Sequence, residues 1–75
     1  MTPRVAVHKR ISDTIRKRRE ALGISQEDFA DTIEMHRAYY GRIERGHKDL
    51  RLSTLERICT GLRTPMSDLI RDAGA

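Results

Sequence analysis

The sequence is short of cysteine, aromatic residues and long apolar runs. It has 75 residues, with one cysteine, no tryptophan and 4% aromatic residues. A single cysteine excludes an intramolecular disulfide, and Cys59 lies among the apolar positions of a predicted helix, which indicates a buried thiol in a reducing compartment. No apolar run approaches the length of a membrane span, and residues 1–9 lack the apolar stretch of a signal peptide. These absences predict a cytoplasmic protein without a membrane partner.

Motifs for catalysis and for metal binding are missing as well. The sequence has no nucleophile elbow, no phosphate-binding loop and no convincing triad of serine, histidine and acid. Its three histidines do not have the spacing of metal ligands. We therefore expect no enzyme activity, no catalytic residue, no cofactor, no metal and no small-molecule substrate.

Positive charge is abundant and grouped. The formal net charge is +4, which by itself favours polyanionic partners only weakly. Between positions 36 and 51, five arginines and lysines stand against two acidic residues, and a second basic group occupies positions 16–19. This grouping favours a nucleic acid as the partner.

Apolar residues recur every three to four positions along most of the chain, which predicts amphipathic helices and no strands. The expected fold is all-α: one compact five-helix domain over residues 9–72, preceded by a flexible N-terminal arm over residues 1–8. The first helix is expected over 9–22 and the third over 36–45. The other three are expected to open at Ser25, at Ser53 and at Pro65, with Pro65 in the first helical position.

Capping residues mark several of these helix ends. Gly23 and Gly46 follow apolar stripes and can adopt the left-handed conformation that ends a helix. Ser25 is the predicted N-cap of the second helix. Ser53 and Glu56 match a capping box, in which each side chain satisfies a backbone donor near the other.

A tight turn at Glu34-Met35 joins the second and third predicted helices, and the outer face of the third is basic. This is helix-turn-helix geometry, in which a helix about 10–12 Å across enters a major groove about 12 Å wide. Two segments carry the pattern: Gly23-Ile24-Ser25-Gln26-Glu27-Asp28-Phe29-Ala30 and Ile43-Glu44-Arg45-Gly46. They resemble the signature of the Cro/C1-type (phage-repressor-like, XRE) helix-turn-helix family, and the resemblance covers about residues 11–69.

Within that family, the run from His36 to Gly46 is especially similar to the controller proteins of restriction–modification systems, which are small stand-alone dimers. The resemblance implies a lambda-repressor-like DNA-binding domain that regulates transcription. Four positions depart from the family pattern: Ala38 stands where threonine is usual, Glu34 where glycine begins the turn, Gly41 where serine is common, and Leu50 where proline is usual. We expect a strained or altered turn at Glu34, and a close approach of another backbone or of DNA at Gly41. Ala38 leaves the identity of the target sequence open.

The outer face of the predicted recognition helix supplies four candidates for contacts with base edges: Arg37, Ala38, Tyr39 and Arg42. Arg37 leads because an arginine in the first turn can donate two bonds to guanine O6 and N7. The alternatives are a solvated arginine at position 37 and an ordinary surface tyrosine at position 39, whereas Tyr40 fits the core. Contacts with DNA phosphates are predicted for Gln26, His36, His47 and Lys48. The alternatives are an N-cap role for His36 and a plain solvated loop at His47 and Lys48.

The family resemblance further implies an internal ion pair between Arg19 and Glu44, which would tie the first helix to the third. Because one helix reads only a few base pairs, we expect a homodimer on a near-palindromic double-stranded operator, with two recognition helices about 34–36 Å apart. The apolar residues of the fifth helix are expected to form the dimer interface or, alternatively, to close the monomer core: Met66, Leu69 and Ile70. The alternative function is an antitoxin-type module that binds a toxin as well as DNA.

Overall fold

The computed structural model describes residues 6–47 and 50–74, and over these residues it contains helices and turns without a strand. The all-α prediction is therefore confirmed. No helix in the described part of the chain is both long and apolar enough to cross a membrane. The helices are α1 (Val7–Ala21), α2 (Gln26–Thr32), α3 (Arg37–Glu44), α4 (Leu52–Leu62) and α5 (Met66–Asp72).

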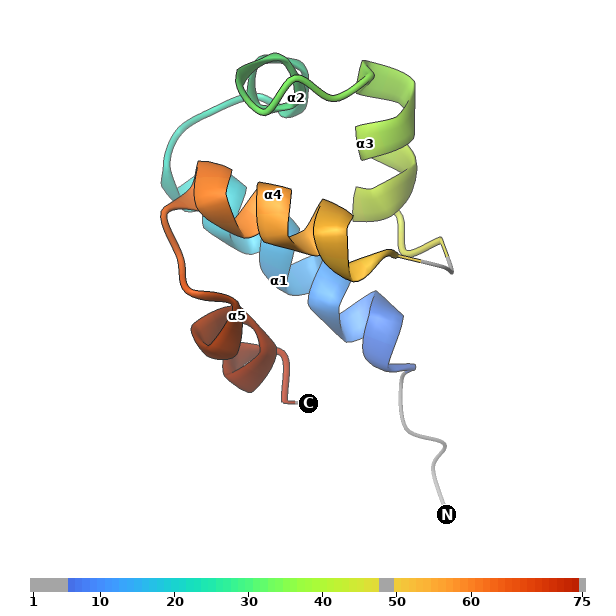
Figure 1. Ribbon diagram of the computed structural model, residues 1–75, viewed down its shortest axis with the longest axis vertical. Helices are drawn as coiled ribbons and strands as arrows, with labels where there is room; N and C mark the ends of the chain where they lie inside the picture. Colours follow the sequence, from blue (N-terminus) through green and yellow to red (C-terminus); the bar gives the residue numbers. More distant parts are fainter. Residues whose placement is uncertain (1–5, 48–49, 75) are drawn as a thin grey trace.

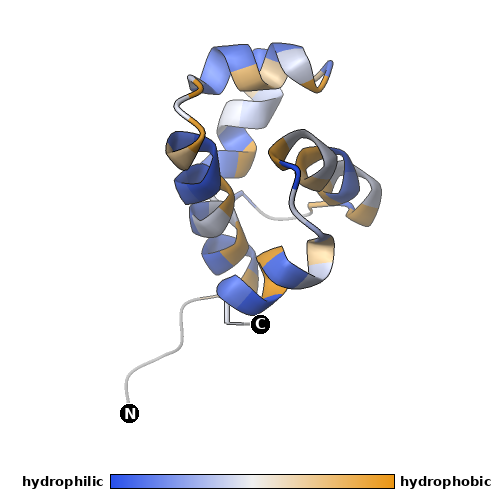
Figure 2. Ribbon diagram, turned by 90° about the vertical axis from the view of Figure 1, so that its left-hand side faces the viewer, coloured by the Kyte–Doolittle hydropathy of each residue, from blue (hydrophilic) through white to orange (hydrophobic). Residues whose placement is uncertain are grey.

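Helix α1 is the centre of the arrangement, because it packs against α3, α4 and α5. Figure 1 shows α2 and α3 together at one end of the molecule, α4 alongside α1, and α5 at the opposite end near the C-terminus. In Figure 2 the hydrophilic residues of α1 lie on its outer side and its hydrophobic residues turn toward the other helices. The core that results contains Ile15, Phe29, Ala30, Ile33, Met35, Tyr40, Ile43, Leu55, Ile58, Cys59, Leu62 and Leu69.

The ends of α2 and α3 follow the capping residues of the sequence. The Ser25 side chain accepts a hydrogen bond from the Asp28 backbone N–H at 3.1 Å, as an N-cap does. His36 caps α3, since its Nδ1 accepts from the Ala38 N–H at 3.3 Å. Gly23 and Gly46 have φ of 72° and 85°, so both adopt the left-handed conformation that we predicted.

The predicted boundaries differ from the observed ones by one or two residues: the expected ranges 9–22 and 36–45 include Leu22, His36 and Arg45, which are capping residues in the structure. The starts of α1, α4 and α5 differ too. Helix α1 begins at Val7, because Val7 continues the stripe of Ile11 and Ile15 by one more turn; residues 7 and 8 therefore belong to the helix, and positions 1–5 of the expected arm lie outside the described residues. Helix α4 begins at Leu52, and α5 begins after Pro65 rather than with it.

The predicted capping box at the start of α4 is not formed. Arg51, with ψ of 147°, is the last extended residue, so Ser53 already lies inside the helix and its side chain makes no capping bond. A capping box needs its serine in the non-helical N-cap position. Pro65 takes that position at the start of α5, with ψ of 141° and no side-chain cap.

The turn between α2 and α3 is a Schellman motif with a glutamate in the position of its glycine. The Met35 N–H donates to the Ala30 carbonyl at 2.8 Å, and the Glu34 N–H donates to the Asp31 carbonyl at 3.1 Å. These are the two bonds that define the motif. Glu34 has φ of 56°, a conformation in which the Cβ atom crowds the following carbonyl oxygen. The strain expected at Glu34 is therefore present in its backbone.

A buried ion pair joins α1 to α3. Arg19 Nε donates to Glu44 Oε2 at 2.6 Å, and Arg19 Nη2 donates to Glu44 Oε1 at 3.0 Å. Arg19 and Glu44 are 8% and 3% exposed. The third nitrogen of Arg19 donates to the Ile24 carbonyl at 2.7 Å, and the Gln26 amide donates to Glu44 at 3.2 Å. One guanidinium and one carboxylate thus connect α1, the loop that follows it, α2 and α3.

The ion pair shifts the pKa values of its members. Burial acts to raise the pKa of Glu44, but the hydrogen bonds from Arg19 and Gln26 outweigh it, and the pKa lies below its ordinary value. The hydrogen bond with Glu44 raises the pKa of Arg19. Burial also raises the pKa of the Tyr40 phenol, whose ring packs against Phe29 at 5.2 Å between centroids. The charged forms of Arg19 and Glu44 are therefore the ones that the folded state favours.

Replacing Glu44 with glutamine is expected to destabilise the domain by about 3–5 kcal/mol, because the Arg19 charge stays buried without its partner. Thermal unfolding followed by circular dichroism measures the loss. The matched control is Glu56→Gln, which removes the same charge from an exposed position of α4 and should change the stability by about 0.5 kcal/mol or less.

The pH dependence of unfolding gives a second measurement of the same pair. Since the pKa of Glu44 is lowered by folding, its contribution is complete above the pKa of an unfolded glutamate, about 4.3, and is lost as the pH falls through the lower folded value. The difference in stability between the wild-type chain and Glu44→Gln should therefore shrink on acidification. Equal melting temperatures of the two chains at neutral pH would contradict this role of the pair.

Replacing Glu34 with glycine is expected to stabilise the domain by about 1 kcal/mol, because glycine adopts positive φ without the steric penalty of a Cβ atom. Glu34→Ala is the control, since it removes the carboxylate but keeps the Cβ atom. Chemical denaturation of the three chains measures the effect. If alanine stabilised the domain as much as glycine, the charge of Glu34 and not its backbone conformation would be the cause.

Candidate nucleic-acid interface

Helix α3 has one buried and one exposed face. Tyr40, Ile43 and Glu44 point into the molecule, and Tyr40 is fully buried. The residues predicted to contact base edges are all exposed and lie on the opposite side: Arg37, Ala38, Tyr39 and Arg42. Because the buried face packs on α1 and α2, the other face is turned to solvent.

A hollow of about 690 Å³ lies between α3 and the beginning of α4. Its lining includes three arginines and two histidines but one acidic residue, Glu34. His36, Tyr39 and Arg42 line it from the α3 side, and Arg51 and Arg57 from the α4 side. The exposed face of α3 therefore continues into a basic surface.

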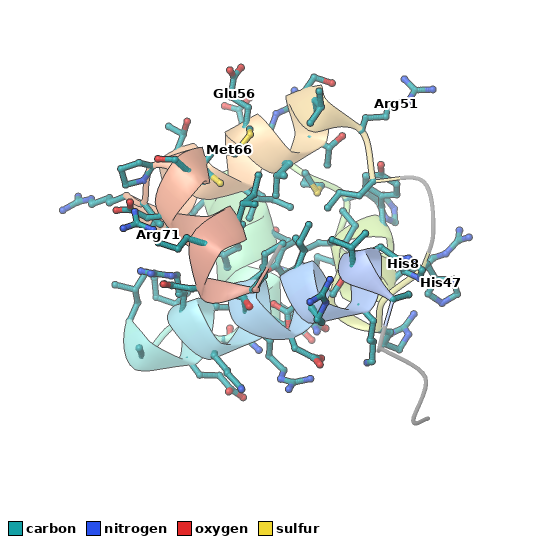
Figure 3. All side chains as sticks on the ribbon, turned by 90° about the horizontal axis from the view of Figure 1, so that it is seen from below. His8, His47, Arg51, Glu56, Met66 and Arg71 are labelled. Atoms are coloured by element: carbon teal, nitrogen blue, oxygen red, sulfur yellow. The ribbon has the colours of Figure 1, made fainter. Side chains whose placement is uncertain are left out.

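The arginines of this hollow differ from most other cations of the molecule in their partners. Ion pairs with acidic side chains are formed by Lys9, Arg16, Arg18, Arg19, Arg37 and Arg71. Within residues 6–47 and 50–74, no carboxylate lies within ion-pair distance of Arg42, Arg51 or Arg57. Figure 3 places Arg51, His47 and His8 at one end of the molecule and Arg71 at the other. Four further described cations, at positions 10, 17, 45 and 63, also form no ion pair. Arg42, Arg51 and Arg57 are distinguished by lining one hollow beside α3.

Arg37 is exposed but paired. Its guanidinium forms hydrogen bonds with Asp31 and Glu27 of α2. The hydrogen bond with Asp31 raises the pKa of Arg37, and the same bond lowers the pKa of the Asp31 carboxyl. The Arg37 side chain is 56% exposed, so it remains a solvated arginine of the surface, now with acidic partners, and its contact with a base stays a prediction.

The predicted phosphate contacts are placed in different environments. His47 is exposed and lines the hollow, and His36 uses its Nδ1 to cap α3. Gln26 is half-buried, and its amide nitrogen donates to Glu44, which leaves one N–H for another acceptor. Lys48 lies outside the described residues.

Within the protein, Gly41 faces side chains and not the other backbone that we expected it to approach; its approach to DNA stays a prediction. A Cβ atom at this position would lie 3.3 Å from both Gln26 Oε1 and Arg45 Nη1. That separation is tighter than ordinary van der Waals contact, so the glycine leaves room for the amide that bonds to Glu44.

The fifth helix corrects one predicted residue of the dimer interface. Leu69 is fully buried in the core of the single chain, so it closes the monomer and cannot contact a partner. Met66 and Ile70 are half-buried. The spacing of the three residues predicted one apolar stripe. In the structure, Leu69 of this stripe lies in the core.

Two arginines of the hollow were missed as site residues at the sequence level. Arg51 stands at the N-cap of α4, where no side-chain capping bond is present, and Arg57 lies further along the same helix. The signal available was the position of Arg51 at the end of the basic stretch, directly before a helix. Nothing in the spacing of Arg57 shows that α4 packs beside α3. Among the described residues, no group of three histidine, cysteine or acidic side chains is placed to hold a metal ion.

Comparison with known proteins agrees with this geometry. The helix-turn-helix family model HTH_3 matches residues 15–69. The control protein C.MunI of Mycoplasma sp is 42% identical over 55 residues, which cover 73% of this chain and 74% of that protein. The restriction–modification controller protein C.Esp1396I, crystallised as a tetramer with its natural 35 base-pair operator, has 29% identity and a TM-score of 0.80, with 96% of this chain and 100% of that chain covered.

The fold is shared more widely than the sequence. The clp gene regulator ClgR of C. glutamicum has a TM-score of 0.89 over 99% of this chain and 95% of that chain, at 20% identity. The family match covers both helices of the motif and the core residues that hold them. The chain belongs to the Cro/C1-type helix-turn-helix family, with restriction–modification control proteins among its relatives.

Proposed function

We propose that this protein is a transcriptional regulator that binds a specific site in double-stranded DNA through the exposed face of α3. The observation that carries the proposal is the position of Arg42, Arg51 and Arg57, which surround that face without an acidic partner among the described residues. A polyanion that supplies phosphates to these arginines would neutralise charge that no acid of residues 6–47 and 50–74 compensates.

The dimensions of α3 fit the major groove. A helix about 10–12 Å across enters a groove about 12 Å wide, and its N-terminal residues then meet the base edges. In this pose Arg37, Ala38 and Tyr39 are nearest to the bases, and Arg42 lies one turn after Ala38 on the same face. Ala38 has the apolar side chain that contacts a thymine methyl group.

The start of α4 suits a DNA phosphate. The first N–H groups of a helix have no partner within the helix and carry a partial positive charge. In α4 no side chain caps these groups, and arginines 51 and 57 line the same hollow. We infer that one strand of the backbone lies in this hollow while α3 occupies the groove, with His36 and His47 as further phosphate contacts.

A homodimer on a near-palindromic operator follows from the small size of the reading surface. One helix discriminates among too few base pairs to select a site in a genome, whereas two related by a twofold axis read two half-sites about one helical turn apart. A tetramer with a 35 base-pair operator is what was crystallised for C.Esp1396I. We propose Met66 and Ile70 as contacts between two copies, since both keep part of their apolar surface exposed.

Single substitutions of arginines should separate phosphate contacts from base contacts. Arg51→Gln is expected to weaken binding to a selected operator and to random duplex by the same factor, and to lower the slope of log K against log salt by about 0.9. Arg37→Ala should instead weaken the operator by about 1–3 kcal/mol and change random duplex little. Fluorescence anisotropy over a series of salt concentrations measures both quantities.

The control for Arg51→Gln is Lys17→Gln, which removes one exposed positive charge from α1. It should leave the salt slope unchanged. Equal slopes of log K against log salt for the Arg51 and Lys17 variants would contradict the placement of α4 in the DNA interface. Absence of any duplex affinity in the wild-type chain at low salt would refute the proposed function altogether.

Selection of bound sequences from random DNA is expected to return two inverted half-sites with centres about 10–10.5 base pairs, or a multiple, apart. Ile70→Asp should weaken self-association in sedimentation and lower the affinity for the full operator more than for one half-site. Leu22→Asp places the same charge on another half-exposed apolar residue, outside α5, and should do neither. A wild-type chain that stays monomeric on a full operator would contradict the dimer.

A further inference from the structure

We infer that Asp31, assisted by Glu27, positions Arg37 for base reading and thereby sets the sequence specificity of α3. The inference rests on the proposed function and adds two α2 residues to the machinery of recognition. Neither acid touches a base in this assignment. Both act through the guanidinium of Arg37.

The contacts of Arg37 are directional. Its Nε donates to Asp31 Oδ1 at 3.1 Å and its Nη2 to Asp31 Oδ2 at 2.7 Å, so the carboxylate holds one edge of the guanidinium with two bonds. Its Nη1 donates to Glu27 Oε2 at 3.3 Å. Bonds of this kind fix the plane of the guanidinium as well as its position. They span the turn between α2 and α3 and order the side chain in the free protein.

The hydrogen bonds with Asp31 and Glu27 leave Arg37 with enough free N–H donors to bind a guanine. An arginine has five N–H groups: one on Nε and two on each terminal nitrogen. Asp31 takes one on Nε and one on Nη2, and Glu27 takes one on Nη1. One N–H remains on each terminal nitrogen, which is the number that a bidentate contact with O6 and N7 uses. Asp31 and Glu27 therefore use three of the five N–H donors of Arg37 and leave two free.

The same acids act against binding to arbitrary DNA. Asp31 and Glu27 have side chains 52% and 70% exposed, and they lie next to the residue that enters the groove. A carboxylate in that place repels the phosphates of every duplex, whatever its sequence. A DNA site whose base edge accepts both remaining N–H donors of Arg37 would recover the affinity that this repulsion removes. Specificity is a difference between two affinities. A repulsion common to every duplex lowers both of them, so the ordering of Arg37 is what raises their ratio.

The test is the ratio of affinities for the selected operator and for random duplex, measured for the full chain by anisotropy. Asp31→Asn should lower this ratio by about three- to tenfold, the effect of losing the pre-ordering of one long side chain. Random duplex should bind more tightly, because the repulsion of its phosphates is relieved and it gains nothing from an ordered Arg37. Glu27→Gln should have the same effect to a smaller extent, because it makes one bond and not two.

Glu56→Gln is the charge-matched control, since it removes an exposed acid that forms no ion pair with a described residue. Any effect of net charge alone appears in this variant too. Asp31→Glu, which keeps the carboxylate, should restore part of the ratio. In an Arg37→Ala background, Asp31→Asn should change the ratio no more than Glu56→Gln does.

Base selection provides a readout that a merely structural role would not change. Asp31→Asn should relax the preference at the same base positions that Arg37→Ala relaxes, with an unaltered melting temperature. Equal ratios for Asp31→Asn and Glu56→Gln in the presence of Arg37 would overturn the inference and leave the proposed function intact. A wild-type chain without sequence preference would overturn both.

Discussion

The bidentate contact between Arg19 and Glu44 holds the recognition helix in place. Helix α3 has eight residues, too few to be stable alone in water, so its orientation comes from what its inner face touches. Glu44 sits on that face, and through Arg19 and Gln26 it connects α1, α2 and the loop between them. Apolar contacts do not depend strongly on direction, whereas the hydrogen bonds of a buried ion pair do. A rotation of α3 would break these bonds and leave a buried charge without its partner.

Cations on different helices differ in whether an acid neutralises them. Most cations of α1 and α5 are neutralised by neighbouring acids, such as Arg18 by Asp72 and Arg71 by Asp68. The arginines that line the hollow beside α3 have no such partner in the described part of the chain. A modest net charge therefore produces a concentrated positive field on one side, which is the property that attracts a polyanion in a defined orientation.

Local signals in the sequence predicted much of the fold and less of the site. Helical spacing, Gly23, Gly46 and Ser25 were enough to place α2 and α3, since each acts over one turn of backbone. The prediction of a capping box at Ser53 was wrong because the box also requires the serine to be the last extended residue before the helix, and in α4 that residue is Arg51. The pairing of Arg37 with Asp31 spans six residues and a turn, which no helical spacing rule covers. Whether Leu69 faced the core or a partner was equally undecidable, because both surroundings select the same apolar side chain.

The two-faced construction of α3 has a consequence for how such proteins diversify. The buried residues of α3 that secure the helix and the exposed residues that we propose to read DNA occupy opposite faces of its eight positions. If the proposal holds, substitutions at the exposed residues of α3 would change the preferred operator and leave the buried residues unchanged. A new regulator and operator could then arise without loss of stability. Arg37 limits this modularity, since its carboxylate partners belong to the preceding helix. A transplant of recognition onto another scaffold must carry both helices as one unit.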